Sequence, residues 1–214
     1  MTNSRDTVPS RGAIERAAHE FQLTLNEQQV LQIQQYTRIL WAWNEKVNLT
    51  AIRDPIEMLY RHFCESMIGA SLLPVENCRL ADVGSGGGFP GLPLKIIRPD
   101  LTVFLVESNA KKATFLAEVI RELGLTDARV LVSRFEELGE EVAPLDVVCS
   151  RALGDFARFL AWAASPQVDA KQALLWLGGR DVEEVRAQPG WFWEEPTPVP
   201  KSLQRFILLG SRAG

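Results

Sequence analysis

The most constraining feature of this sequence is a cluster of glycines that follows a short apolar run. Residues 80–91 read LADVGSGGGFPG, and five glycines fall within the eight residues from Gly84 to Gly91. Glycine has no side chain to bury and loses the most backbone entropy on folding, so such a cluster does not make a core. It suits a tight turn in which the backbone approaches a ligand closely, and the kind of ligand then determines the function.

Size and composition limit the alternatives. The chain has 214 residues, 46% of them hydrophobic, which suffices for one α/β core with a small appendage. Its apolar runs are short, so we expect no membrane span, and we expect the polar residues 1–11 to be a frayed tail rather than a signal peptide. Three separated cysteines and two histidines predict a cytoplasmic protein with reduced thiols and no metal site.

The charge of the chain is unevenly distributed. The net charge is −4, but residues 136–200 contain 12 acidic and 5 basic residues, whereas residues 201–214 contain 3 basic and no acidic ones. The negative charge is therefore concentrated in one segment. A local basic patch elsewhere is compatible with a nucleic-acid partner, although composition alone does not establish one.

The first 75 residues predict helices. Asn26 suits the N-cap of a helix, whose helical spacing gives the apolar positions Val30, Ile33, Tyr36, Ile39, Leu40 and Trp43. Asp54 followed by Pro55 suits the start of another helix. Regular helical spacing in this second helix predicts one apolar face, made of Ile56, Leu59, Tyr60, Phe63, Met67 and Ala70.

After Pro74, strand-like and helical runs alternate, which predicts a mostly parallel sheet with helical crossovers. The expected strands are 79–83, 102–107, 129–132, 145–149, 173–176 and 205–209, and the expected helices are 91–98, 110–123, 154–164 and 181–187. We interpret residues 191–193, which three prolines follow, as a surface-packing segment. The division expected is a helical extension at 1–75 and a ligand-binding domain at 76–214.

The glycine spacing distinguishes between two kinds of nucleotide ligand. In the dinucleotide-binding pattern G-x-G-x-x-G, the third glycine would fall on the bulky Phe89. The pattern formed by Asp82, Gly84, Gly86 and Gly88 instead resembles motif I of class I S-adenosylmethionine-dependent methyltransferases. A tight strand–helix turn without a ligand is the alternative.

Two further positions fit the same ligand. Glu107 ends a strand-like run 23 residues after Gly84, where a carboxylate can accept hydrogen bonds from ribose hydroxyls. Methyltransferases of this class often hold the adenine after the third strand, at the position of Phe135 and Glu136. Glu136 is equally compatible with a solvated helix start.

The end of the fourth predicted strand faces the substrate in this class. Cys149 is a weak candidate for a catalytic nucleophile, because a thiol in an apolar strand is usually buried and inert. Arg151 follows the strand directly and is placed to bind a carboxylate or a phosphate.

Several motifs together resemble the small-subunit rRNA methyltransferase G family, also called glucose-inhibited division protein B. They are WNEKVNLT at 43–50, RH at 61–62, DVGSGGGFPG at 82–91, ESNAKKATFL at 107–116 and SRA at 150–152. The resemblance implies a Rossmann-like class I methyltransferase with a seven-stranded, mostly parallel sheet and an N-terminal helical extension. It also implies methylation of guanine N7 in 16S rRNA, family position 527, with S-adenosyl-L-methionine as donor.

The family's cofactor contacts carry over to Gly84, Phe89, Glu107, Phe135, Glu136 and Arg151. Two departures stand out. Glu65 replaces the aspartate usual in the motif after Arg61-His62, and Leu177-Gly178-Gly179 lacks the lysine commonly seen before a glycine. These departures put a role for residue 65 and for that lysine in doubt.

We expect a monomer that acts on 16S rRNA or the small ribosomal subunit, with RNA contacts among its basic residues and Arg151 positioning the substrate. The candidate RNA contacts are Lys46, Arg61, His62, Lys111, Lys112 and Arg134. For most of them, a solvated surface charge is the alternative interpretation. Another class I methyltransferase, or a nucleotide-binding module without catalysis, are the competing functions.

Overall fold

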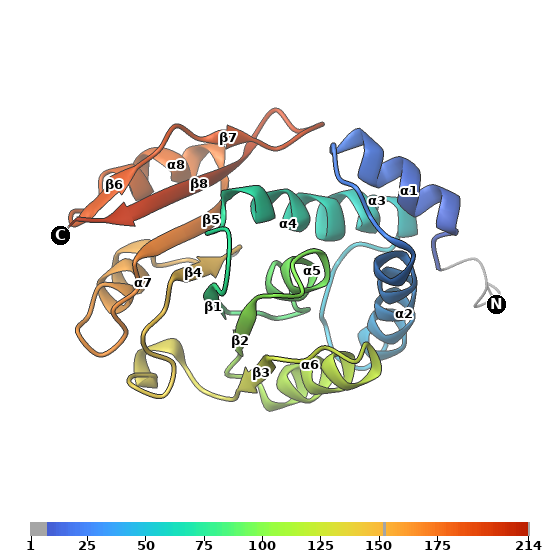
Figure 1. Cartoon of the computed structure of the whole chain (residues 1–214), viewed down its shortest axis with the longest axis horizontal. Coiled ribbons are helices and arrows are strands. Elements are labelled where there is room, and N and C mark those ends of the chain that lie inside the picture. The colour runs from blue at the N-terminus through green and yellow to red at the C-terminus, as the bar shows by residue number, and fades with distance from the viewer. Residues whose placement is uncertain (1–7, 152, 214) are drawn as a thin grey trace.

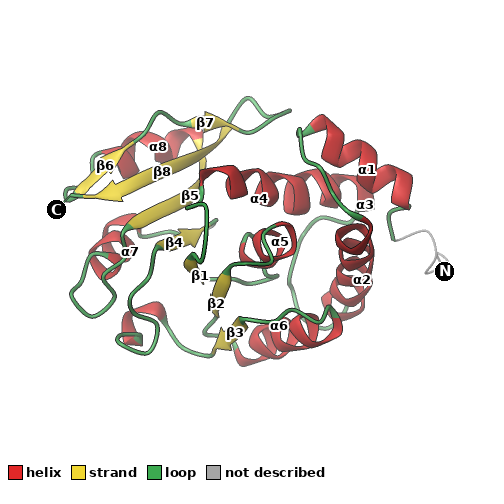
Figure 2. Cartoon of the chain, viewed as in Figure 1, coloured by secondary structure: helices red, strands yellow, loops and turns green. Residues whose placement is uncertain are grey.

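In the residues that the computed structural model describes, 8–151 and 153–213, eight strands pair in one sheet (Figures 1 and 2). They are β1 (Arg79–Val83), β2 (Thr102–Val106), β3 (Ala128–Leu131), β4 (Val147–Ser150), β5 (Gln172–Gly178), β6 (Trp191–Trp193), β7 (Thr197–Pro198) and β8 (Arg205–Arg212). The order is β3-β2-β1-β4-β5-β8-β6, and β7 also pairs with β8. Strands β3, β2, β1, β4 and β5 run parallel, whereas β8 is antiparallel to β5. The predicted α/β fold is confirmed, with eight strands in place of seven.

Helices cover both faces of the sheet. They are α1 (Arg11–Glu20), α2 (Glu27–Asn44), α3 (Pro55–Met58), α4 (Glu65–Met67), α5 (Gly91–Ile97), α6 (Ala110–Glu122), α7 (Phe156–Ala163) and α8 (Gly179–Arg186), with a π-helix η1 (Leu59–Cys64) and 3-10 helices η2 (Ile68–Leu72) and η3 (Phe135–Glu137). Figure 1 shows α7 and α8 on one side of the sheet and α2, α4, α5 and α6 on the other. None of the described helices is long and apolar enough to cross a membrane.

Each face of the sheet has its own hydrophobic core. Successive side chains of a strand point to opposite faces, so Leu80 lies in the core under α2 and α5, whereas Ala81 and Val83 lie in the core under α7 and α8. Both cores are closed, because the helices on both faces bury the parallel strands.

The N-terminal helices pack directly on the sheet. Asn26 caps α2 through a reciprocal pair of hydrogen bonds with Gln29, and Asp54 accepts a hydrogen bond from the Glu57 amide at the start of α3. Tyr36 of α2 lies in the same core as Leu80. The division at residue 75 stays a prediction. The frayed tail expected at 1–11 is wrong for its last residues, because Pro9 is buried, Ser10 caps α1 and Arg11 begins it, whereas residues 1–7 lie outside the described part of the chain.

The predicted apolar face of the helix after Asp54 is partly wrong. Residues Leu59–Cys64 form a π-helix, whose hydrogen bonds span five residues instead of four. The wider turn changes which side chains face inward, so Met58 and Cys64 are buried, while Ile56 is 42% exposed. Regular helical spacing could not anticipate this shift.

The segment 191–193 is a strand of the sheet and not a surface-packing segment. It forms β6, antiparallel to β8, with Trp191 buried and the Trp193 ring packed over Gly210. The pairing depends on β8, which comes later in the chain, and the prolines that follow hide the strand pattern. Phe192, between the two tryptophans, faces outward and is 71% exposed.

Candidate functional site

The glycine loop connects β1 to α5 at the carboxyl end of the parallel strands. Gly84, Gly86 and Gly88 adopt φ angles of +73°, +54° and +85°, which favour glycine over any other residue. The amides of Gly84 and Ser85 both donate hydrogen bonds to the Val106 carbonyl, at 2.9 and 3.1 Å. The loop therefore continues along the end of β2 before it turns into the helix.

The underside of the loop is closely packed. A Cβ at Gly88 would collide with the Tyr36 hydroxyl and with Leu92, and a Cβ at Gly91 would lie 2.6 Å from Leu105. The Tyr36 hydroxyl, completely buried, donates a hydrogen bond to the Gly87 carbonyl. Helix α2 thus fixes the loop from below, a role that its apolar spacing did not reveal.

The opposite side of the loop is open. Gly84 is exposed, and a Cβ built on it meets no atom within 4 Å. Positive φ excludes most side chains here, although the surrounding structure leaves space for one. Bare backbone beside empty space is the arrangement expected where a ligand lies against the chain.

Asp82 supports the loop from inside. Its side chain is fully buried, and its Oδ2 accepts a hydrogen bond from the Gly91 amide at 3.0 Å. Burial raises the pKa of this carboxyl to about 7, against the hydrogen bonds that lower it. The predicted ligand-binding residue therefore lies behind the glycines, where it fixes the start of α5.

Glu107 lies beside the loop at the end of β2, as predicted. Its Oε2 accepts the Gly86 amide at 3.0 Å, and its Oε1 accepts the Asn109 amide at 2.8 Å. A carboxylate has about four acceptor sites, so each oxygen keeps one for a ligand hydroxyl. These two hydrogen bonds orient the carboxylate before any ligand binds.

Phe89 belongs to an aromatic stack that joins the loop to the N-terminal helices. Its ring stacks between His62, at 4.4 Å between centroids, and Tyr36, at 5.4 Å. The Nε2 of His62 lies 2.6 Å from the Thr50 hydroxyl, and Asn44 binds the backbone of Thr50 in turn. Burial, together with the nearby arginines, lowers the pKa of His62 to about 3, so its ring is neutral.

The segment after β3 places the two predicted adenine contacts next to each other in η3. Phe135 is half-buried against Phe159 and Trp162, with ring centroids 6.0 and 5.3 Å away. The Glu136 carboxylate pairs with Arg158 at 2.9 Å. Both residues follow the carboxyl end of β3, and Glu107 follows the carboxyl end of the neighbouring parallel strand β2, so all three lie at the same edge of the sheet.

Arg151 lies beside the glycine loop, because Ser150 binds the Val83 carbonyl through its hydroxyl at 2.8 Å. Its guanidinium is largely buried, and burial lowers its pKa to about 10. The Nη2 atom lies 3.4 Å from Glu65, whereas the buried Nη1 has no hydrogen-bond partner among the described residues. Ala152, the last residue of the predicted SRA motif, lies outside the described residues.

Glu65 is a site residue that the sequence left in doubt. It is 2% exposed and contacts three arginines, Arg61, Arg151 and Arg205. Arg205 comes from β8, far along the chain, so no local signal in the sequence could have identified this contact.

The predicted RNA contacts separate into two groups. Lys46, Lys111 and Arg134 are exposed, and Lys112 is half-buried in the first turn of α6. Arg61 and His62 are half-buried and contact protein groups. Their RNA contacts stay predictions, and for His62 the observed contacts are those of a structural residue.

The described residues contain neither a metal-binding group nor a reactive thiol near the loop. No three His, Cys, Asp or Glu side chains in residues 8–151 and 153–213 are arranged to hold a metal ion. Cys149 is fully buried and lies near Asp82, and burial raises the pKa of its thiol well above the usual range. A cysteine nucleophile is therefore disfavoured.

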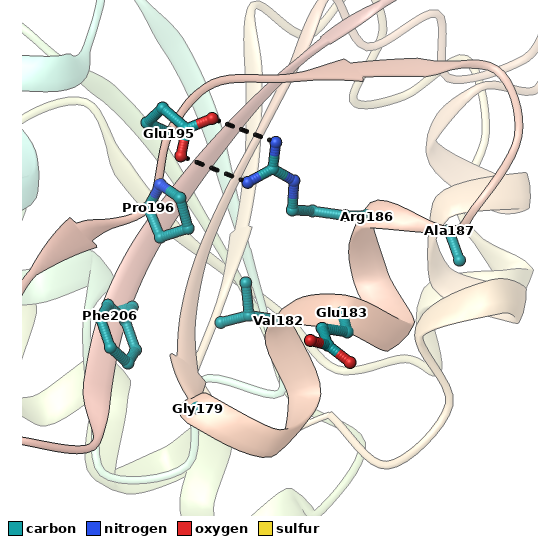
Figure 3. A pocket seen from close by; sticks show the side chains of 8 residues that line it. All are labelled: Gly179, Val182, Glu183, Arg186, Ala187, Glu195, Pro196 and Phe206. Atoms are coloured by element: carbon teal, nitrogen blue, oxygen red, sulfur yellow. Dashed lines mark hydrogen bonds and ion pairs between the residues drawn. The ribbon is translucent and has the colours of Figure 1, made fainter.

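A separate hollow of about 620 Å³ lies between α8 and the β6–β7 segment. Figure 3 shows Phe206 and Val182 on its wall and the ion pair of Arg186 and Glu195 across its rim, at 3.3 Å. None of the glycine-loop residues lines it. It is therefore distinct from the candidate site.

Comparison with known proteins agrees with this geometry. The model of a family described as rRNA small subunit methyltransferase G matches residues 29–192. The chain is 35% identical to the ribosomal RNA small subunit methyltransferase G of Dichelobacter nodosus over 92% of both proteins. It is also 40% identical to that of Sorangium cellulosum, over 86% of this chain and 78% of the relative.

Solved structures show the same fold at low identity. A SAM-dependent methyltransferase from Aquifex aeolicus aligns with a TM-score of 0.58 and 17% identity, over 75% of this chain and 94% of that one. M. capricolum TrmK, solved with S-adenosyl-homocysteine, aligns with a TM-score of 0.52 and 13% identity, over 67% and 65%.

The raised pKa of Asp82 predicts a pH-dependent stability. The folded state keeps a proton up to pH about 7 that the unfolded chain loses near pH 4, so the wild type loses stability as the pH rises through this window. The loss is up to about 1.4 kcal/mol per pH unit. Asp82→Asn keeps an acceptor for the Gly91 amide but has no proton to lose. We therefore expect its unfolding free energy, measured in urea, not to show this decrease with pH.

The quantity to measure is the difference in unfolding free energy between Asp82→Asn and wild type. As the pH rises from about 5 to about 7, the unfolding free energy of the variant should increase relative to that of the wild type. His62, whose lowered pKa changes stability in the opposite direction, is present in both proteins and cancels in the difference. A difference that does not change with pH would contradict the raised pKa.

Proposed function

The chain belongs to the rRNA small subunit methyltransferase G family, and from this premise we propose its reaction. It transfers the methyl group of S-adenosyl-L-methionine to N7 of a guanine in 16S rRNA, family position 527. The observation that carries this proposal is the open backbone at Gly84 with the Glu107 carboxylate oriented beside it. We further propose that the protein acts in the cytoplasm, as a monomer, on the rRNA or the small ribosomal subunit.

We propose that different residues around the loop bind different parts of the cofactor. The bare backbone at Gly84 and Gly86 takes the amino-acid part, with Gly88 shaping the turn against α2, and the free acceptor sites of Glu107 take the ribose hydroxyls. Phe135 and Glu136 take the adenine. Asp82 and Phe89 support the loop from inside, where both are buried.

The chemistry matches the groups present. The cofactor, when bound, supplies an electrophilic methyl group on a positively charged sulfur. Guanine N7 carries an in-plane lone pair and no proton, so the protein needs no general base. The chain's task is to hold the two reactants in line, which contributes several kcal/mol of rate enhancement in well-oriented systems. Two titratable side chains near the loop already make internal hydrogen bonds: Asp82 accepts the Gly91 amide, and Nε2 of His62 lies within hydrogen-bond distance of the Thr50 hydroxyl.

Guanine recognition falls to the basic residues at the same edge. Arginine donors can bind the N7–O6 edge of a guanine, and single-stranded loops expose that edge. Arg151 lies next to the end of β1 and is the residue that we propose positions the base. Lys46, Lys111, Lys112 and Arg134 are proposed contacts to the RNA backbone.

The direct test is methyl transfer with a labelled donor. We expect the purified protein to label 16S rRNA, supplied naked, as an assembly intermediate or as the complete subunit, and 23S rRNA to serve as the control. Nuclease digestion and chromatography should recover the label as 7-methylguanosine. Label on another nucleoside, on protein or on a small molecule would instead indicate a class I methyltransferase with another substrate. If no methyl group is transferred to any substrate, the remaining interpretation is a nucleotide-binding module without catalysis.

A substitution tests where the cofactor lies. We expect Gly84→Val to weaken binding of S-adenosylhomocysteine at least tenfold in calorimetry, because its side chain would enter the open space beside the loop. Gly124→Val is the matched control, because Gly124 has a φ of +63° and open space but lies at the end of α6. A folded Gly84→Val protein with wild-type affinity would refute the placement.

A further inference from the structure

Glu65 sits at the centre of a cluster of arginines from three separate parts of the fold. Arg205 binds it through two hydrogen bonds, at 2.6 and 3.1 Å, and Arg151 contacts it at 3.4 Å. Arg61, four residues earlier, lies 3.7 Å from the same carboxylate. The cluster therefore ties the π-helix region to the ends of β4 and β8.

The cluster contains more positive than negative charge. Three guanidinium groups face the buried Glu65, and the only other acid paired with them among the described residues is Glu57, 3.5 Å from Arg61 and half exposed. One positive charge is left over. Because a buried ion pair is weak evidence of stabilisation by itself, this excess calls for another explanation.

The excess charge lies at the edge where the glycine loop lies. Arg205 begins β8 and pairs with Gly178, the last residue of the parallel strand β5. Phe206, the next residue, faces the hollow beside α8 (Figure 3), so the Arg205 side chain points to the opposite face of the sheet. Gly178 has no side chain to cover the guanidinium on that face.

Hydrogen-bond donors remain unused at this position. Glu65 engages Nε and Nη2 of Arg205, which leaves the Nη1 donors of a side chain that is 32% exposed. The neighbouring Arg151 has a buried Nη1 without a partner in the described part of the chain. Glu65 therefore holds rigid guanidinium groups that still have donors to offer.

We propose that Arg205, oriented by Glu65, binds a backbone phosphate of the substrate RNA next to the target guanine. The inference rests on the proposed function and assigns a positioning role to a residue of β8. Guanidinium forks match phosphate geometry, and phosphate contacts fix the register of a nucleic acid on its protein. An oriented arginine beside the loop would set the distance between the flanking phosphate and the methyl group.

The test compares two arginines of the same strand. Arg205→Gln removes the proposed contact, and Arg212→Gln is the matched control, because Arg212 is equally exposed and pairs with Asp169 at the other end of β8. Methylation of naked 16S rRNA is measured over a series of RNA, S-adenosylmethionine and salt concentrations. Thermal melting shows whether each variant is folded.

We expect Arg205→Gln to raise the KM for RNA about tenfold, with kcat and the KM for S-adenosylmethionine within about twofold of wild type. The slope of log kcat/KM against log salt should become shallower by about 0.7 to 1, the signature of one lost phosphate contact. Arg212→Gln should behave like wild type. A structural role alone would lower the melting temperature and leave the salt slope unchanged.

Arg205→Lys keeps the inference testable if Arg205→Gln does not fold. It retains the charge and loses the fork, so we expect a raised KM for RNA at an unchanged salt slope. An unchanged KM for RNA in either folded variant, or a change confined to S-adenosylmethionine, would overturn the assignment. If the proposed function is wrong, the wild-type protein itself will methylate no RNA, which is a different result from those above. The assignment of Arg205 would then be wrong as well.

Discussion

The contact between helix α2 and the underside of the glycine loop is the constraint on which the site depends. Glycine-rich backbone has many conformations in the unfolded chain, and only surrounding contacts select one. Here the Tyr36 hydroxyl binds the Gly87 carbonyl, and the Tyr36 ring stacks on Phe89. Asp82 fixes the far end through Gly91. The loop is closed from below by these contacts and open at Gly84 above, so its backbone is ordered before a cofactor arrives.

The N-terminal helices therefore belong to the structural unit that holds the glycine loop. They supply Tyr36 and His62 to the loop and Glu65 to the arginine cluster, each from beneath or beside the sheet. Asn44 and Thr50 extend the same network into the connector between α2 and α3. The polar connector is therefore linked, through Thr50 and His62, to Phe89 of the glycine loop.

The features that local sequence patterns determine were predicted from the sequence, whereas contacts between segments far apart in the chain were not. Alternating apolar runs gave the parallel sheet and the crossover helices, and the glycine spacing with Glu107 gave the candidate cofactor site. Tyr36 looked like one more apolar position of a helix, because only the fold brings its hydroxyl to the loop. Glu65 looked like a departure without a role, because its partner Arg205 lies 140 residues later. Strand β6 was missed for the same reason, because its hydrogen bonds go to β8. The π-helix was missed because its local hydrogen bonds span five residues and break the regular helical spacing.

The most direct test of this account is the affinity of Tyr36→Phe for S-adenosylhomocysteine, measured by calorimetry beside its free energy of unfolding. The variant keeps the ring and its stacking on Phe89 and loses only the hydroxyl that holds Gly87. The account predicts an affinity about five- to tenfold lower, which corresponds to the loss of one hydrogen bond of about 1 to 1.4 kcal/mol. A variant that is less stable but binds with wild-type affinity would show that Tyr36 is only a core residue, and would contradict a loop ordered from below.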